Sequence, residues 1–375
     1  FIYIMNSFGK AAILFIVLIG LGIIYRKYDD KILLQETKDE YEAIQKYLLN
    51  DTNLGSKKPI LWIHVPYEYN SRKWINFYSR SSFDLNQPYM YLCVRSIIRQ
   101  CKDDFNIVII DDKSFEKLIP SWKIDMSKIS NPIVSNFRKL GKMKLLNMYG
   151  GLFCPISFVC MKSIKPMYDN IEKHNKPIVC ETVNRNITSV VSDFSPNIDF
   201  IGSKKNDPTI RNMINFTERL ISNDFGSSSE FIGDISRLCK SKIEKNKILL
   251  VDGKYIGTKD MNDSQIIIDR LISKEYINFY EQKYGILIPN EELLKRIDYK
   301  WFAYLSEKMV LESNTIIGNY MLLANSPDPT GDKNIVKPIP NIDTKGWVEF
   351  WKTPLYNNLY GMKPNFLGNN VLYSK

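Results

Sequence analysis

The sequence predicts an α/β protein with a mixed sheet flanked by helices and an N-terminal transmembrane helix. Three observations predict it: a strand, a helix and a second strand follow one another over residues 60–110, a helical pattern ends at a glycine pair followed by a short apolar strand, and an uncharged apolar run lies near the N-terminus. The strand, helix, strand order is what a nucleotide-binding sheet with parallel strands requires. At 375 residues and 44% hydrophobic content, the chain can bury a full core.

The apolar run covers residues 11–25 (AAILFIVLIGLGIIY), after a short tail of residues 1–10, and basic residues flank it on both sides. As a helix it would be about 22 Å long, somewhat short of a bilayer core of about 30 Å, with the basic side chains reaching the headgroups. A cleavable signal peptide is the alternative, but no small-x-small cleavage site follows the run. We therefore expect an uncleaved, single-pass membrane anchor.

The orientation of this anchor stays open. Arg26, Lys27 and Lys31 outnumber Lys10, which favours a cytoplasmic C-terminal domain. If the domain were lumenal, the sequons would be sites of surface glycosylation; they begin at Asn50, Asn186, Asn215 and Asn262.

Composition limits the partners. Lysine and arginine number 51 against 41 acidic residues, a formal net charge of +10 that suits an anionic surface or a diphosphate. There is no Arg-rich tract, zinc-knuckle spacing or RNA-binding signature, so we expect no nucleic-acid binding. The six cysteines lack metal-ligand spacing and are expected to be small buried hydrophobes, with Cys154 and Cys160 on one face of a single strand.

A charged, mildly amphipathic stem over residues 26–57 should lead into a globular domain over residues 58–325. We expect the elements of that domain to be strands at 60–65, 106–110, 177–183, 199–202 and 248–251, a helix at 88–101, and a helix at 210–220 capped by Asp207. The core side of the helix at 88–101 should carry Tyr91, Val94, Ile97, Ile98 and Cys101. Residues 326–375 are rich in proline, glycine and aromatic residues, and we expect them to cover the domain as an irregular lid or to dock onto a protein partner.

The most informative segment is the helix that ends at Gly150 and Gly151. Apolar residues recur at helical spacing before the glycines, which stop the helix as left-handed caps do, and an apolar strand follows. The segment resembles the DXD-containing glycosyltransferases of family 32, of the initiating mannosyltransferase and capsular polysaccharide synthesis type, whose fold is GT-A. The matching residues of their "S-D-x-x-R-x-x-x-L-x-x-Y-G-G-hydrophobic-x-x-D-x-D" run are Leu146, Tyr149, Gly150 and Gly151, and the resemblance extends over about residues 60–220.

The same alignment shows where this chain departs from the family. The two aspartates of D-x-D fall on Pro155 and Ser157, and the upstream Asp and Arg fall on Lys139 and Lys142. In the family, the D-x-D carboxylates hold a divalent cation on the leaving diphosphate, because hard cations need oxygen ligands. Proline offers no side-chain ligand, so we expect no tight Mn or Mg site and no other cofactor.

Two interpretations of the lost acids remain. Arg138 and Lys142 lie four residues apart on one helical face, with Lys139 beside them, and like charges so placed favour an anionic partner. These cations either replace the metal on a nucleoside diphosphate, or form a solvated basic face on a fold whose catalysis has been lost.

Further residues belong to the predicted nucleotide-sugar site, and the backbone near Gly150 and Gly151 would shape its pocket. His64 ends the first strand at the family's histidine position, and Asp111 and Asp112 follow the second strand where the family has "hydrophobic-L-D". A structural role for His64, and a turn or helix cap at the two aspartates, are the alternatives. A catalytic base would have to come from a carboxylate that no spacing singles out, namely Asp193, Asp199 or Glu230.

The resemblance implies a membrane-anchored glycosyltransferase-like protein without a DXD metal site. If it is active, it transfers a sugar from a nucleoside-diphosphate donor to a glycan acceptor. The alternative is a non-catalytic membrane or assembly scaffold. The Lys, Asn and Ile bias, together with the altered motif, resembles transferase-like membrane proteins of large DNA viruses.

Overall fold

The computed structural model describes residues 58–66, 87, 89–120, 122–130, 132–223, 228–295, 297–303 and 305–326. The predicted anchor, the stem before residue 58 and the extension beyond residue 326 lie outside these residues. All described residues belong to one compact unit. Within the described part of the chain, no helix is long and apolar enough to cross a membrane.

A six-stranded mixed sheet forms the centre of this unit, in the order β2-β1-β3-β6-β5-β7. β1 pairs in parallel with both β2 and β3, β6 runs antiparallel between β3 and β5, and β7 is parallel to β5. The predicted mixed sheet is therefore confirmed. The strands are β1 (Ile60–His64), β2 (Asn106–Ile110), β3 (Gly151–Cys154), β5 (Ile178–Val183), β6 (Phe194–Ser203) and β7 (Leu249–Val251).

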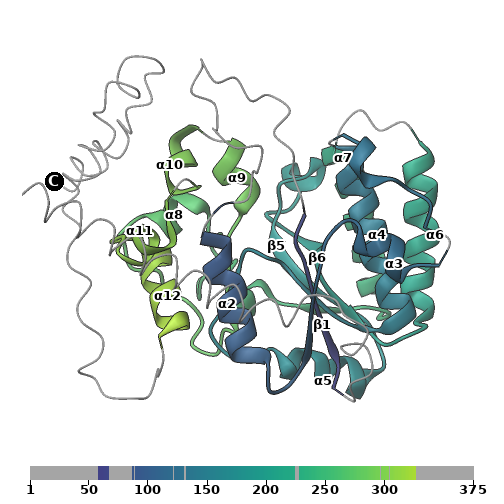
Figure 1. Cartoon of the computed structure of the whole chain (residues 1–375), viewed down its shortest axis with the longest axis horizontal. Helices are drawn as coiled ribbons and strands as arrows, with labels where there is room; N and C mark the ends of the chain where they lie inside the picture. Colours follow the sequence, from purple (N-terminus) through teal and green to yellow (C-terminus); the bar gives the residue numbers. More distant parts are fainter. Residues whose placement is uncertain are drawn as a thin grey trace, which may run out of the picture. The chain divides into compact units, whose positions relative to one another are not determined.

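One face of the sheet is covered by four helices, which share a hydrophobic core with it (Figure 1). They are α3 (Ser114–Leu118), α4 (Ile133–Tyr149), α6 (Pro208–Ser222) and α7 (Ser228–Glu244). Asp207 caps α6 as predicted, because its carboxylate accepts the backbone N–H groups of Thr209 and Ile210. Helix α5 (Lys165–His174) contacts β6.

A second hydrophobic core joins α2 (Tyr89–Cys101) to segments far along the chain. It includes the two-stranded antiparallel sheet of β4 (Phe158–Cys160) and β8 (Gly285–Leu287). Its other helices are α8 (Ile268–Ile272), α9 (Asn290–Lys295), α10 (Lys300–Ala303), α11 (Glu307–Leu311) and α12 (Ile316–Asn325). Short 3-10 turns connect the elements of the unit at Met126–Lys128, Ile187–Val190, Gly253–Ile256 and Ile297–Tyr299.

The glycine pair ends α4 and starts β3 as predicted. Gly150 has φ +72° and Gly151 has φ +110°, a region that favours glycine. A Cβ on Gly151 would lie 2.4 Å from the carbonyl oxygen of Ile60, so β1 and β3 approach each other closely here. The indole N–H of Trp62 donates to the Gly150 carbonyl at 2.9 Å and holds the turn against β1.

Three sequence-based expectations need correction. Cys154 and Cys160 lie on separate strands, β3 and β4, of two different sheets, because the chain turns at Pro155. In α2 the core side is centred on Leu92 and Cys93 rather than on Tyr91 and Ile98, which are only half-buried. The sequon residue Asn186 is 6% exposed, and its side chain caps the turn that follows it.

Candidate functional site

The candidate site lies where β1 and β2 end, on the face that α4 covers. His64 pairs with Ile110 across the parallel strands, so His64 and the residues just after β2 share one edge of the sheet. Side chains alternate along a strand, and Trp62, Val108 and Ile110 face the first core beneath α4. His64 follows Trp62 by two residues and Asp112 follows Ile110 by two residues, so both side chains lie on that same face.

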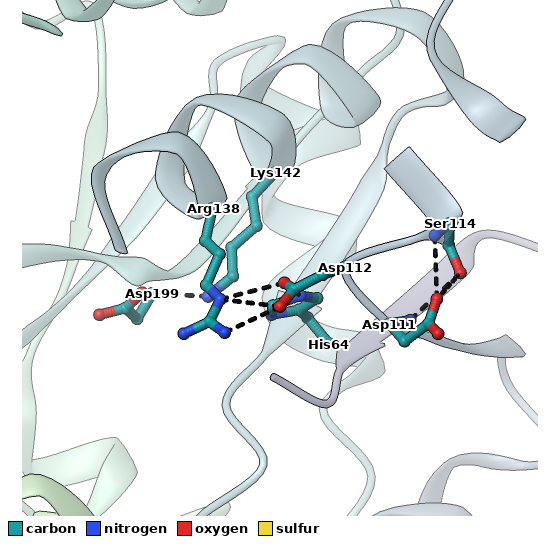
Figure 2. A network of polar contacts seen from close by, with 7 residues as sticks. All are labelled: His64, Asp111, Asp112, Ser114, Arg138, Lys142 and Asp199. Atoms are coloured by element: carbon teal, nitrogen blue, oxygen red, sulfur yellow. Dashed lines mark hydrogen bonds and ion pairs between the residues drawn. The ribbon is translucent and has the colours of Figure 1, made fainter. Parts of the chain in front are cut away.

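Asp112 binds two partners there (Figure 2). His64 Nε2 lies 2.9 Å from its Oδ1. The Arg138 guanidinium, from α4, donates from Nε to Oδ1 at 3.0 Å and from Nη2 to Oδ2 at 2.8 Å. This is the bidentate geometry that arginine forms with carboxylates, and both side chains are largely buried.

The electrostatics fix the protonation states of this group. Burial raises the pKa of Asp112, but hydrogen bonds from His64 and Arg138 outweigh it and lower the pKa to about 2. Burial lowers the pKa of His64, opposed by its hydrogen bond to Asp112, so the ring is neutral at pH 7. Because ionised Asp112 only accepts, we assign the single ring proton to Nε2 and a lone pair to Nδ1.

A second carboxylate, Asp199 of β6, binds the two lysines of α4. Lys139 Nζ lies 3.1 Å from Asp199 Oδ2, and Lys142 Nζ lies 3.1 Å from Asp199 Oδ1. Burial raises the pKa of Asp199, but both lysines together hold it well below the ordinary range. Burial also lowers the pKa of Lys142, with Lys139 and Arg138 contributing and Asp199 opposing.

The two groups form one cluster, which we call the α4 cluster: His64, Asp112, Arg138, Lys139, Lys142 and Asp199. Lys142 joins its halves, since its charge also lowers the pKa of His64. The cluster contains three cations and two carboxylates, so its net charge is +1 with neutral His64. An excess positive charge at low exposure is an anion-binding feature.

Other predicted site residues lie elsewhere. Asp111 points away from the cluster and accepts the backbone N–H of Ser114 at 2.9 Å and its hydroxyl at 2.6 Å (Figure 2). Asp111 thus closes the turn that precedes α3, which is the turn that was an alternative for this residue. Gly150 and Gly151 lie at the start of β3, beside Ile60, whereas His64 ends β1. The structure does not bring the glycines into the cluster.

The two D-x-D positions lie close to the edge of the sheet where β1 and β2 end. Ile63 pairs with Cys154, so Pro155 leaves β3 beside His64. Ser157 is 2% exposed, and its hydroxyl donates to the Ile288 carbonyl at 2.9 Å. Neither residue fits a metal, and the described residues contain no group of three or more His, Cys, Asp or Glu side chains that could hold one.

Asp199 is the site residue that sequence reasoning did not single out. The pairing of β5 with β6 jumps from Val179↔Ile201 to Cys180↔Asn197, so Asp199 lies in a bulge. Bulges re-aim side chains, and no local signal in the sequence marks this one. Of the other two carboxylates considered, Asp193 is exposed in the loop before β6 and Glu230 is exposed in the first turn of α7.

Comparisons with known proteins give one distant similarity to report. No family model matches the chain, and no curated protein matches it. Among solved structures, the chain is similar to one described as "PaToxG Glycosyltransferase", with 12% sequence identity and a TM-score of 0.26. The similarity covers 58% of this chain and 83% of that one. A TM-score this low does not establish a shared fold.

Proposed function

We propose that this chain is a membrane-anchored, glycosyltransferase-like protein of the GT-A type whose α4 cluster binds a nucleoside-diphosphate sugar without a divalent metal. The observation that carries the proposal is the excess of one positive charge in the cluster, at the edge where parallel strands end. Ligands of open α/β sheets bind outside the carboxyl ends of the strands. The resemblance of residues 138–157 to the family 32 run supports the choice of ligand.

In this proposal the cations of α4 perform the task that D-x-D and its metal perform in the family. Lys139 and Lys142 already share one carboxylate, so a diphosphate oxygen would complete the charge balance around Lys142. Preorganised cations that face the leaving diphosphate stabilise the negative charge that develops as the glycosidic bond breaks. Arg138 and Asp112 would hold the neighbouring wall of the site in place.

The test is donor binding by the full chain in detergent, measured as thermal stabilisation by UDP- and GDP-sugars, first in EDTA and then with Mn²⁺. We expect stabilisation by one donor that survives EDTA. Lys142→Met removes the excess charge while leaving Lys139 paired with Asp199, and should weaken donor binding about tenfold or more. Lys144→Met is the matched control, because Lys144 lies on the same helix but pairs with Glu218.

A second candidate function is the non-catalytic scaffold. It is favoured by the burial of Cys154 and Ser157, which are each 2% exposed, and by the hydrogen bond from the Ser157 hydroxyl to the Ile288 carbonyl. A folded full chain that shows no stabilisation with any donor, in EDTA or with Mn²⁺, would contradict donor binding and support this scaffold. Membrane anchoring, orientation and a partner for residues 326–375 are parts of either proposal.

A further inference from the structure

Two cysteines meet between α2 and β4, away from the α4 cluster. Cys101 ends α2 and Cys160 ends β4, 59 residues later, with their Sγ atoms 3.9 Å apart. Both side chains are fully buried. Of the six cysteines, all of which the structure describes, these are the two whose sulfur atoms lie within hydrogen-bonding distance of each other.

A buried polar contact fixes these elements against each other. The backbone N–H of Cys160 donates to the hydroxyl of Ser96 at 2.9 Å, and that hydroxyl donates to the Cys93 carbonyl at 2.6 Å. Ser96 is fully buried, so this link between strand and helix is shielded from water. The two sulfur atoms are therefore held as neighbours by the packing and by a hydrogen bond that does not involve them.

We propose that Cys101 and Cys160 form a disulfide bond when the chain folds in an oxidising compartment. The two thiols lose two protons and two electrons to a disulfide oxidant such as glutathione disulfide, which is reduced to two thiols, and one S–S bond forms. A disulfide has an S–S distance of about 2.05 Å, so the sulfur atoms must approach by about 2 Å. Rotation of both side chains about their Cα–Cβ bonds moves sulfur atoms over such distances.

The timing of this reaction follows from burial. Burial raises the pKa of the Cys160 thiol well above its ordinary value, aided by its hydrogen bond with Cys101. The thiolate is the nucleophile in disulfide exchange, so the folded, reduced protein reacts slowly. The bond forms while the chain folds, before the two thiols are fully buried.

The test is disulfide mapping of the full chain after refolding in a glutathione redox buffer. Free thiols are blocked with N-ethylmaleimide under denaturing conditions, and the protein is then digested with trypsin and chymotrypsin. Trypsin cleaves after Arg95 and Arg99 and so separates Cys93 from Cys101, and chymotrypsin cleaves after Phe158 and so separates Cys154 from Cys160. We expect one cross-linked pair, Cys101 with Cys160, and N-ethylmaleimide on the other four cysteines. All six thiols blocked, or a different pair, would overturn the proposal.

Thermal unfolding provides an independent readout. The bond closes a long loop, so the oxidised protein should melt about 5 °C or more above the reduced protein. Cys101→Ser should abolish that difference between oxidised and reduced samples. Cys239→Ser should retain it, since Cys239 is equally buried but lies on α7. A difference that persists in Cys101→Ser would also contradict the proposal.

Discussion

Arg138 binds both carboxylate oxygens of Asp112, with Nη2 to Oδ2 at 2.8 Å and Nε to Oδ1 at 3.0 Å. The bond joins α4 to the end of β2, so it fixes the helix over the edge of the sheet where the candidate site lies. The same carboxylate holds His64 from β1. One aspartate thus connects three elements that the sequence separates by up to 74 residues, counting from His64 to Arg138 (138 − 64).

Arg138→Met should destabilise the protein by about 3 kcal/mol, because it leaves the carboxylate of Asp112 buried without its main cation. Arg138→Lys should recover only part of this loss, since lysine cannot form two parallel bonds. Urea denaturation would measure both. Lys128→Gln is the control: its partner is the exposed Asp125, and we expect no measurable change in the free energy of unfolding. Equal effects in all three variants would contradict the role of the bidentate bond.

His64 should make stability depend on pH just below neutrality. Its folded pKa lies below its ordinary value of 6.5, so as the pH falls through 6.5 the unfolded chain takes up a proton before the folded one does. The free energy of unfolding must therefore decrease as the pH falls from 7.5 to 5. In His64→Gln, whose amide can still donate to Asp112, this slope should be shallower. Identical slopes would show that His64 does not titrate as inferred.

Asp199→Asn should cost about 2 kcal/mol near pH 7, because it leaves two buried lysines without their carboxylate. The estimate is at the lower end for a buried pair, since the Asp199 side chain is 31% exposed. Adding Lys142→Met should restore part of the loss in a double-mutant cycle. If the loss in the double variant equalled the sum of the losses in the two single variants, coupling between these two residues would be excluded.

The same aspartate should contribute to acid stability. The folded pKa of Asp199 is depressed, so its contribution is present above the ordinary value of 3.8 and is lost as the pH falls below it. Asp112, with a folded pKa of about 2, adds to the loss over pH 3.8 to 2. Asp199→Asn should therefore flatten, but not remove, the fall in stability across this range in acid titrations followed by circular dichroism.

Gly151→Ala should prevent stable folding or cost more than about 3 kcal/mol, because φ is +110° and the new Cβ would lie 2.4 Å from the rigid Ile60 carbonyl. Gly233→Ala is the control. Gly233 has no positive φ, and its Cβ would lie 2.5 Å from Cγ2 of Ile187, a side chain that is 46% exposed and can rotate about χ1, so we expect a smaller loss than at Gly151. Thermal unfolding of both variants would distinguish the two sites. A stable Gly151→Ala protein would contradict the close approach of β1 and β3.

Local signals predicted much of the fold around the site. The apolar runs that became β1 and β2, the glycine pair that ends α4 and the cap at Asp207 all depend on residues close in sequence. Local signals did not decide between Asp111 and Asp112, because the sequence does not say which face of β2 lies under α4. Asp199 was harder still, since a bulge in β6 directs it to the lysines. Pairing across strands decided these positions.

The second core has a consequence for protein synthesis. The Asn325 side-chain amide donates to the Leu92 carbonyl across 233 residues, and α2 packs on helices formed from residues 268–325. At about 5–20 residues per second, a ribosome needs roughly 12–47 s to make that stretch. Throughout this interval the nascent chain carries the apolar face of α2, with Tyr89, Leu92 and Cys93, without its final cover. A chaperone that shields this helix during translation would therefore affect the yield of folded protein more than one acting on the completed chain.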